Sequence, residues 1–229
     1  MELISEFIQN MQEFFEVVFI YIPRFIPGVM MTLQLSVLSI VLGTVFGLTA
    51  TLFKMTKIKP LEKVIDVYIS IVRGTPLLLQ LIFIFNALPE IGITFSPFIS
   101  AAIGLAFHSG AYISEIFRGA IESIDGGQRE AAISLGMNKW QAMKRITLPQ
   151  AFKRSVPSLG NQFIIAIKDS SLASAITITE TLMLTRQFVA ATFNPWPIFF
   201  VAGLYYMLIT TILSKALLRL EKRLKVYER

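Results

Sequence analysis

The sequence predicts an all-α protein that crosses a membrane about five times. Its 229 residues are 54% hydrophobic and only 16% charged, with a mean hydropathy of +0.65, whereas soluble domains are typically about 25% charged. The charges cluster and leave long apolar runs, and a spanning helix needs about 20 mostly apolar residues. No polar block is long enough to fold as a separate soluble domain.

Residues 1–22 are predicted to form an interfacial helix ahead of a transmembrane domain over 23–229. A secretory signal opens with positive charge, but this chain opens with acids, so we expect no cleaved signal. Glu6, Glu13 and Glu16 recur at helical spacings and leave one face apolar. Such a helix is expected to lie in the membrane interface rather than to cross it.

Five later segments are long and apolar enough to span. The second is interrupted by the sequence R-G-T-P at 73–76, and the fourth contains Pro149 and Pro157. The stretch 170–192 is rich in Ser and Thr, and two readings stay open for it: a sixth span, or a short re-entrant pair, which requires shielding by protein or water. The five predicted spans are roughly 25–53, 61–88, 97–121, 145–168 and 196–220.

The distribution of Lys and Arg predicts the orientation. With Arg73 set apart as intramembrane, 17 of them fall on one side and only Arg24, Lys168 and Arg186 on the other. Because cytoplasmic loops collect positive charge, we expect the N-terminus outside and the C-terminus inside, as an odd number of spans requires. The net charge of +6 is thereby explained without nucleic-acid binding. The inner group is Lys54, Lys57, Lys59, Lys63, Arg118, Arg129, Lys139, Lys144, Arg145, Lys153, Arg154, Lys215, Arg219, Lys222, Arg223, Lys225 and Arg229.

A polar loop near 126–137, on the predicted cytoplasmic side, follows the spacing E-A-A-x3-G-x9-I-x-L-P from Glu130 to Pro149. Gly126-Gly127 is expected to break the preceding helix, and 128–135 to form a short helix with Glu130 in its first turn, where a carboxylate suits the helix dipole. Gly136 lets the chain reverse, and a further helix is expected to begin near Asn138. An ordinary capped turn is the alternative interpretation.

This spacing resembles the EAA loop of bacterial ABC importer permeases. Further motifs resemble the polar amino-acid branch of that family: R-G-T-P-L-L-x-Q-L at 73–81, S-x-A-Y-x-x-E-I-x-R at 109–118, G-Q-x-E-A-A-x-S-L-G at 127–136, L-P-Q-A at 148–151 and P-x-L-G-N at 157–161. The resemblance implies a type I importer permease fold in which the loop is a coupling helix that docks on an ATPase. The implied coupling residues are Gln128, Glu130, Ala131, Ala132, Leu135 and Gly136.

Polar residues of the third and fourth spans are the candidate substrate site. An amino-acid zwitterion needs donors for its carboxylate and acceptors for its ammonium, and the resemblance implies that it binds between these spans. Family members that carry cationic amino acids often have a carboxylate where this chain has Gln162, so a neutral or polar amino acid is favoured, with cystine as one example. The candidates are His108, Ser109, Tyr112, Asn161, Gln162, Lys168 and Asp169.

Each of these positions also has a structural interpretation. A lone histidine such as His108 is often structural, and for Lys168 with Asp169 an ion pair at the outer interface is slightly favoured over contact with the substrate. Arg73 lies within a predicted span, where charges are costly and usually functional. We expect it to act with Gly74 and Pro76 as a hinge, satisfying carbonyls freed at the break, or to reach the interface. Direct contact with the substrate is a third, less favoured alternative. Pro157 is a further candidate hinge.

Motifs for ATP hydrolysis and metal binding are absent from the sequence, and this absence indicates which partners the chain needs. There is no G-x-x-x-x-G-K-[ST] phosphate loop, no cysteine and one histidine, so the chain is expected to be a transport subunit rather than an enzyme, without metal or cofactor. ATP and Mg are expected on a partner ATPase. The resemblance implies two ATPase copies, a second permease subunit (identical or not), an extracytoplasmic amino-acid-binding protein, and a bacterial cytoplasmic membrane.

Three other functions are weighed. A permease for another small polar solute would keep the same fold. A secondary transporter usually shows two related halves, and no internal repeat is found. A membrane-embedded enzyme would use Glu115, His108 and Tyr112 for acid–base chemistry, but no nucleophile lies beside them in the sequence.

Overall fold

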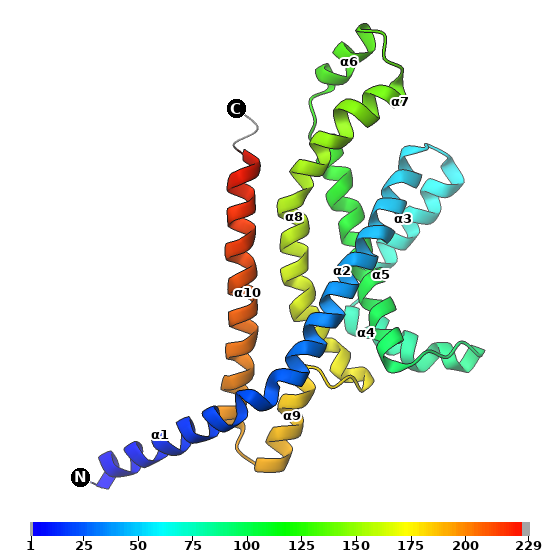
Figure 1. Ribbon diagram of the computed structural model, residues 1–229. Coiled ribbons are helices and arrows are strands. Elements are labelled where there is room, and N and C mark those ends of the chain that lie inside the picture. Colours follow the sequence, from blue (N-terminus) through cyan, green and yellow to red (C-terminus); the bar gives the residue numbers. More distant parts are fainter. Residues whose placement is uncertain (1, 226–229) are drawn as a thin grey trace.

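The computed structural model describes residues 2–225, and every regular element within that range is helical (Figure 1). The predicted all-α fold is confirmed. Met1 and residues 226–229 lie outside the described residues, and with them Arg229 from the predicted inner charges. The α-helices are α1 (Glu2–Tyr21), α2 (Ile26–Met55), α3 (Lys59–Gly74), α4 (Leu77–Ile82), α5 (Pro97–Glu122), α6 (Gly126–Ser134), α7 (Lys139–Ala142), α8 (Leu148–Asp169), α9 (Thr181–Thr192) and α10 (Pro195–Lys225).

Shorter helical turns join these elements. Three are 3₁₀-helices, and two are wider π-helical turns that continue α4 and precede α8. The chain runs through Pro157 without leaving α8. The 3₁₀-helices are Pro23–Phe25, Leu88–Ile91 and Ser170–Ile176, and the π-helical turns are Phe83–Ala87 and Met143–Thr147.

Length and composition alone qualify two helical stretches of the described chain to cross a membrane, Ile4–Met55 and Pro195–Leu224. A third qualifies if Lys59–Gly74 and Leu77–Ile91, bent by 109°, count as one span. Helices α5 and α8, which match the third and fourth predicted spans in position, do not pass this test. Both pack in the middle of the bundle beside α2 (Figure 1), and both carry buried polar residues.

The most extensive helix pair is α2 with α5, and small residues bring the two backbones together. A Cβ at Gly47 would lie 2.7 Å from Ile113 Cγ2 and 2.9 Å from the Gly110 carbonyl oxygen. Small residues at such crossings allow close helix packing in membranes. Hydrogen bonds add to the contact, since the Ser39 and Ser109 hydroxyls lie 3.0 Å apart.

The break between α3 and α4 is stabilised by a side chain that was not predicted to act there. Thr75 is extended, as expected for a residue before proline. The Gln80 amide donates to the Val72 carbonyl at 2.9 Å and to the Thr75 carbonyl at 3.2 Å. The expectation that Arg73 satisfies these carbonyls is therefore wrong. Gln80 reaches them from the first turn of α4, whereas Arg73 points to α5.

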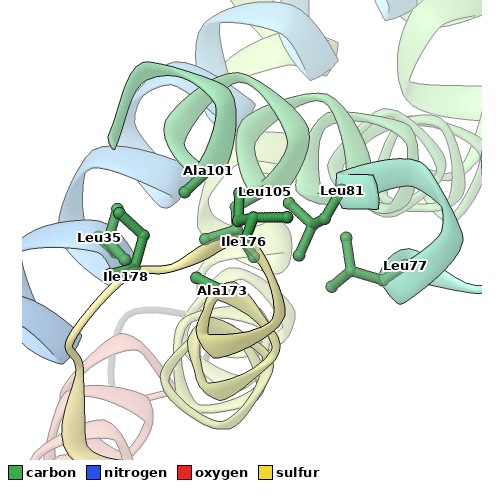
Figure 2. Close-up of a cluster of buried hydrophobic side chains, with 8 residues drawn as sticks. All are labelled: Leu35, Leu77, Leu81, Ala101, Leu105, Ala173, Ile176 and Ile178. Carbon is green, nitrogen blue, oxygen red and sulfur yellow. The ribbon is translucent and has the colours of Figure 1, made fainter. Parts of the chain in front are cut away.

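The bent pair is anchored by a buried apolar cluster (Figure 2). Side chains from α2, α4, α5 and the segment that contains the 3₁₀-helix Ser170–Ile176 meet there, whereas Gly74 and Pro76 at the break between α3 and α4 are exposed. Broken helices are tolerated in a membrane only where protein or water surrounds the backbone, so this break needs water or a neighbouring protein beside it. The cluster comprises Leu35, Leu77, Leu81, Ala101, Leu105, Ala173, Ile176 and Ile178.

The stretch 170–192 is a short helix pair and not a sixth span. The 3₁₀ segment ends at Thr177, which has a left-handed backbone with φ of 70°. Helix α9 has 12 residues, about 18 Å of helix, whereas a hydrocarbon core is about 30 Å thick. Of the two alternatives, the short pair is the one observed.

Candidate functional site

The loop that carries the EAA spacing forms a helical hairpin from α6 and α7, residues 126–142, between α5 and α8 (Figure 1). The Asp125 side chain caps α6 by accepting from the Gly127 amide at 2.8 Å. Gly136 reverses the chain with φ of 88°, as predicted. Asn138 caps α7 in a reciprocal pair with Gln141, at 2.9 and 3.0 Å.

The predicted start of the first helix of this hairpin is wrong by two residues. Helix α6 begins at Gly126 rather than near Gln128, so Glu130 lies outside the first turn. The two glycines are tolerated at the start of the helix because Asp125 supplies the carboxylate that the dipole favours there. Sequence reasoning treated the glycine pair as a break and overlooked the preceding capping residue.

The α6–α7 hairpin presents an exposed face. Leu135 is 83% exposed and Trp140 is 62% exposed, while Gln128, Glu130, Ala131 and Gly136 are also exposed. Exposed large apolar side chains of this kind are typical of protein contact surfaces. Ala132 differs from the other predicted coupling residues because it is buried, at 4% exposure. The sequence analysis did not include Trp140 among the coupling residues. A usable signal was available, because Trp140 follows the Asn138 cap and therefore lies in the first turn of the second hairpin helix.

Two polar contacts tie the hairpin region to α8. The Gln150 amide donates to the Gln128 side-chain oxygen and, at 2.9 Å, to the Ile146 carbonyl. The Arg154 guanidinium donates to the Ser123 carbonyl at the end of α5. Helix α8 is therefore hydrogen-bonded both to the hairpin, through Gln128, and to the end of α5, through Ser123.

A polar cavity of about 370 Å³ lies between α3, α5 and α8. Its lining carries charges of both signs together with hydroxyl and carboxamide groups, and Gln162 is buried while Ser158 and Asn161 remain exposed at its open side. A few convergent polar groups in a pocket of this size are typical of small-molecule sites. The lining residues are Arg73, Tyr112, Glu115, Ile116, Ser158, Asn161 and Gln162.

An ion network runs along one wall of this polar cavity. The Arg73 guanidinium contacts Glu115 Oε2 at 3.4 Å, and Arg118 holds the same carboxylate with bonds of 2.9 and 3.1 Å. Arg118 also donates to Glu122 at 2.6 Å. Among the described residues, no group of three or more His, Asp or Glu side chains is arranged to hold a metal ion.

The predicted substrate residues divide into two groups. Tyr112, Asn161 and Gln162 line the polar cavity. The other four do not line it: the His108 ring hydrogen-bonds Gln80 at 3.1 Å and lies 5.0 Å from the Tyr112 ring, Ser109 bonds Ser39, and Lys168 with Asp169 lies at the far end of α8.

Sequence reasoning missed Ser158 as a cavity residue and left Arg73 and Glu115 out of the candidate substrate site. Arg73 was assigned to the hinge, with substrate contact as a third alternative, and Glu115 was considered only for acid–base chemistry with His108 and Tyr112. The spacing of Tyr112 and Glu115, three residues apart on one helix, was the available signal.

Comparison with known proteins identifies relatives over most of the chain. The family described as "Binding-protein-dependent transport system inner membrane component" matches residues 39–226. The glutamine transport system permease protein GlnP of Escherichia coli (strain K12) is 40% identical over 207 residues, which are 90% of this chain and 94% of the relative. The L-cystine transport system permease protein TcyB of Bacillus subtilis (strain 168) is 39% identical over 201 residues, 87% of this chain and 86% of the relative.

Solved structures are similar as well. A chain from the structure described as "Crystal structure of an amino acid ABC transporter with histidines" superimposes with a TM-score of 0.85 at 38% identity, covering 89% of this chain and 95% of that one. A chain of the MetNI methionine ABC transporter in an inward-facing conformation gives a TM-score of 0.73 at 18% identity, a likeness of fold alone.

Proposed function

The chain belongs to the family of binding-protein-dependent transport system inner membrane components, and from this premise we propose how it moves its substrate. It is the permease subunit of an amino-acid ABC importer and not an enzyme. An ATPase and a substrate-binding protein are its partners. The substrate we propose is a neutral or polar amino acid, with glutamine and cystine, named for the two relatives above, as first candidates.

The observation that carries this proposal is the connection between the polar cavity and the α6–α7 hairpin. Helices α5 and α8 both line the cavity, and the same two helices flank the hairpin. A displacement of the hairpin is therefore transmitted through two continuous helices to the cavity walls. The hairpin is the element that we propose docks on the ATPase, through Glu130, Ala131 and Leu135 at its exposed face.

The proposed cycle is alternating access. ATP and Mg bind to the ATPase, which draws two hairpins together and opens the cavity toward the outside, where the binding protein delivers the substrate. Hydrolysis and release return the cavity to the inside. The proposed topology has α1 in the outer interface, the N-terminus outside and the C-terminus inside, in agreement with the distribution of Lys and Arg.

A second permease subunit is also proposed. Arg73, Ser158 and Asn161 are exposed at the open side of the polar cavity, and charged or amide groups within spanning segments need protein or water around them rather than lipid. A second subunit, identical or closely related, would cover this side. Two permease subunits then require two ATPase subunits beneath them.

The proposal is tested by uptake into proteoliposomes that contain the permease, its ATPase and its binding protein. The twenty common amino acids and cystine are offered in turn, with ATP or a non-hydrolysable analogue inside. We expect ATP-dependent accumulation of a neutral or polar amino acid. Accumulation driven by a proton or sodium gradient without ATP, or of a solute that is not an amino acid, would contradict it.

A further inference from the structure

The Arg73 side chain lies at the edge of the polar cavity with unused hydrogen-bonding capacity. Its guanidinium is at the last turn of α3, 5.6 Å from the centre of the Tyr112 ring, and its side chain is 46% exposed. Within residues 2–225, its guanidinium donates a hydrogen bond to Glu115 alone, at 3.4 Å. A guanidinium has several N–H donors in a planar fork that fits a carboxylate.

Glu115 does not depend on Arg73 for its partners. Arg118 already binds both of its oxygens, at 3.1 Å to Oε1 and 2.9 Å to Oε2. This paired contact has the forked geometry typical of strong arginine–carboxylate pairs. The longer contact from Arg73 is therefore the one that a competing carboxylate can displace at small cost.

We infer that Arg73 binds the carboxylate of the transported amino acid, a role that rests on the proposed function. The Tyr112 hydroxyl is the second donor on the same side of the cavity, since its ring lies beneath the guanidinium. Glu115 accepts from the substrate ammonium. Asn161 and Gln162, on the α8 wall, contact the substrate side chain and offer both donors and acceptors to a polar group.

A purely structural role for Arg73 would be to hold α3 against α5 through Glu115. Loss of transport after mutation would follow from that role as well. The two roles differ in one measurable respect: only carboxylate binding makes the preference for a ligand with a carboxylate depend on Arg73. The test therefore compares matched ligands that differ in the carboxylate alone.

The experiment measures binding to the purified permease–ATPase complex in nanodiscs, without nucleotide or binding protein. The ligands are L-glutamine and 4-aminobutanamide, which keeps the ammonium and side-chain amide but lacks the carboxylate. For L-cystine the matching analogue is cystamine, which keeps the disulfide and both ammonium groups but lacks both carboxylates. We expect the wild-type complex to bind the amino acid about 10- to 100-fold more tightly than its analogue, the range expected for one charge-assisted pair.

In Arg73→Gln this preference should fall to about twofold or less, and Arg73→Lys, which keeps the charge but not the fork, should give an intermediate value. Arg24→Gln is the matched control, because Arg24 also lies over a tyrosine ring, Tyr21 at 4.9 Å, but outside the polar cavity. It should retain the wild-type preference. An Arg73→Gln complex that keeps the wild-type preference would overturn the inference alone, whereas a wild-type complex that binds neither amino acid would overturn glutamine and cystine as the proposed substrates.

Discussion

Glu180 is a fully buried carboxylate that connects α9 with α10. Its Oε1 accepts from the Met183 amide at 2.8 Å, and its Oε2 accepts from the Leu182 amide at 2.8 Å and from the Tyr206 hydroxyl at 3.1 Å. It therefore caps α9 and joins it to α10. Loss of a helix cap costs up to about 2 kcal/mol, and each buried donor left unpaired costs about 1–3 kcal/mol.

We predict that Glu180→Ala lowers the free energy of unfolding by about 2–4 kcal/mol. The thermal stability of the purified complex, followed by the loss of its monodisperse peak on heating, measures the effect. Glu6→Ala removes an exposed carboxylate from α1 and is the control, with little expected change. Equal stability of the two variants would show that the Glu180 cap contributes nothing.

Single residues show where the sequence was sufficient for the site and where it was not. Tyr112, Asn161 and Gln162 were predicted because each lies on a polar helix face, and the three do line one cavity. Ser109 was predicted for the same reason, but its hydroxyl is used by Ser39 in the contact with α2. Whether a polar helix face meets a cavity or another helix depends on where the neighbouring helix packs. The spacing of residues within one helix does not determine that packing.

The α2–α5 contact gives a prediction for whole elements. At Gly47 an added Cβ would lie 2.7 Å from Ile113 Cγ2 and 2.9 Å from the Gly110 carbonyl oxygen, and a carbonyl cannot move aside without moving α5. Gly47→Ala should therefore destabilise the complex by about 1–3 kcal/mol, the range for overpacked cores. Gly203→Ala in α10 has open space around its Cβ and should be neutral or slightly stabilising. The test compares the melting temperatures of the Gly47→Ala and Gly203→Ala complexes. Equal values would exclude a close α2–α5 contact.

The connection between the α6–α7 hairpin and α8 gives a second prediction at this scale. Gln150 bonds Gln128 in the hairpin and the Ile146 carbonyl in the π-helical turn. Gln150→Ala removes both bonds and loosens the hairpin from α8, so uptake should fall several-fold while ATP hydrolysis continues. The ratio of substrate imported to ATP hydrolysed, measured in proteoliposomes, is the readout. Gln187→Ala, an exposed glutamine of α9, should leave the ratio unchanged; an unchanged ratio in Gln150→Ala would contradict the proposed transmission.

At the scale of the whole molecule, the helices were predictable because apolar runs and capping residues are local signals. The predicted span 97–121 corresponds to α5 (Pro97–Glu122), and the predicted start near Asn138 corresponds to its capping pair with Gln141. The 109° bend between α3 and α4 was not predictable in size. It depends on the cluster formed by residues of α2, α5 and Ser170–Ile176, which are far apart in sequence.

Orientation and assembly can be tested together because the chain has no cysteine, so single cysteines can be placed at will. Leu135 is 83% exposed in the α6–α7 hairpin, and Phe193 is 89% exposed between α9 and α10. We predict that a membrane-impermeant maleimide labels Leu135→Cys only from the cytoplasmic side and Phe193→Cys only from the outside. Addition of the ATPase should protect Leu135→Cys and leave Phe193→Cys reactive, because only the hairpin is proposed to dock. Labelling of Leu135→Cys from outside would reverse the topology, and full reactivity in the assembled complex would exclude this face as the docking surface.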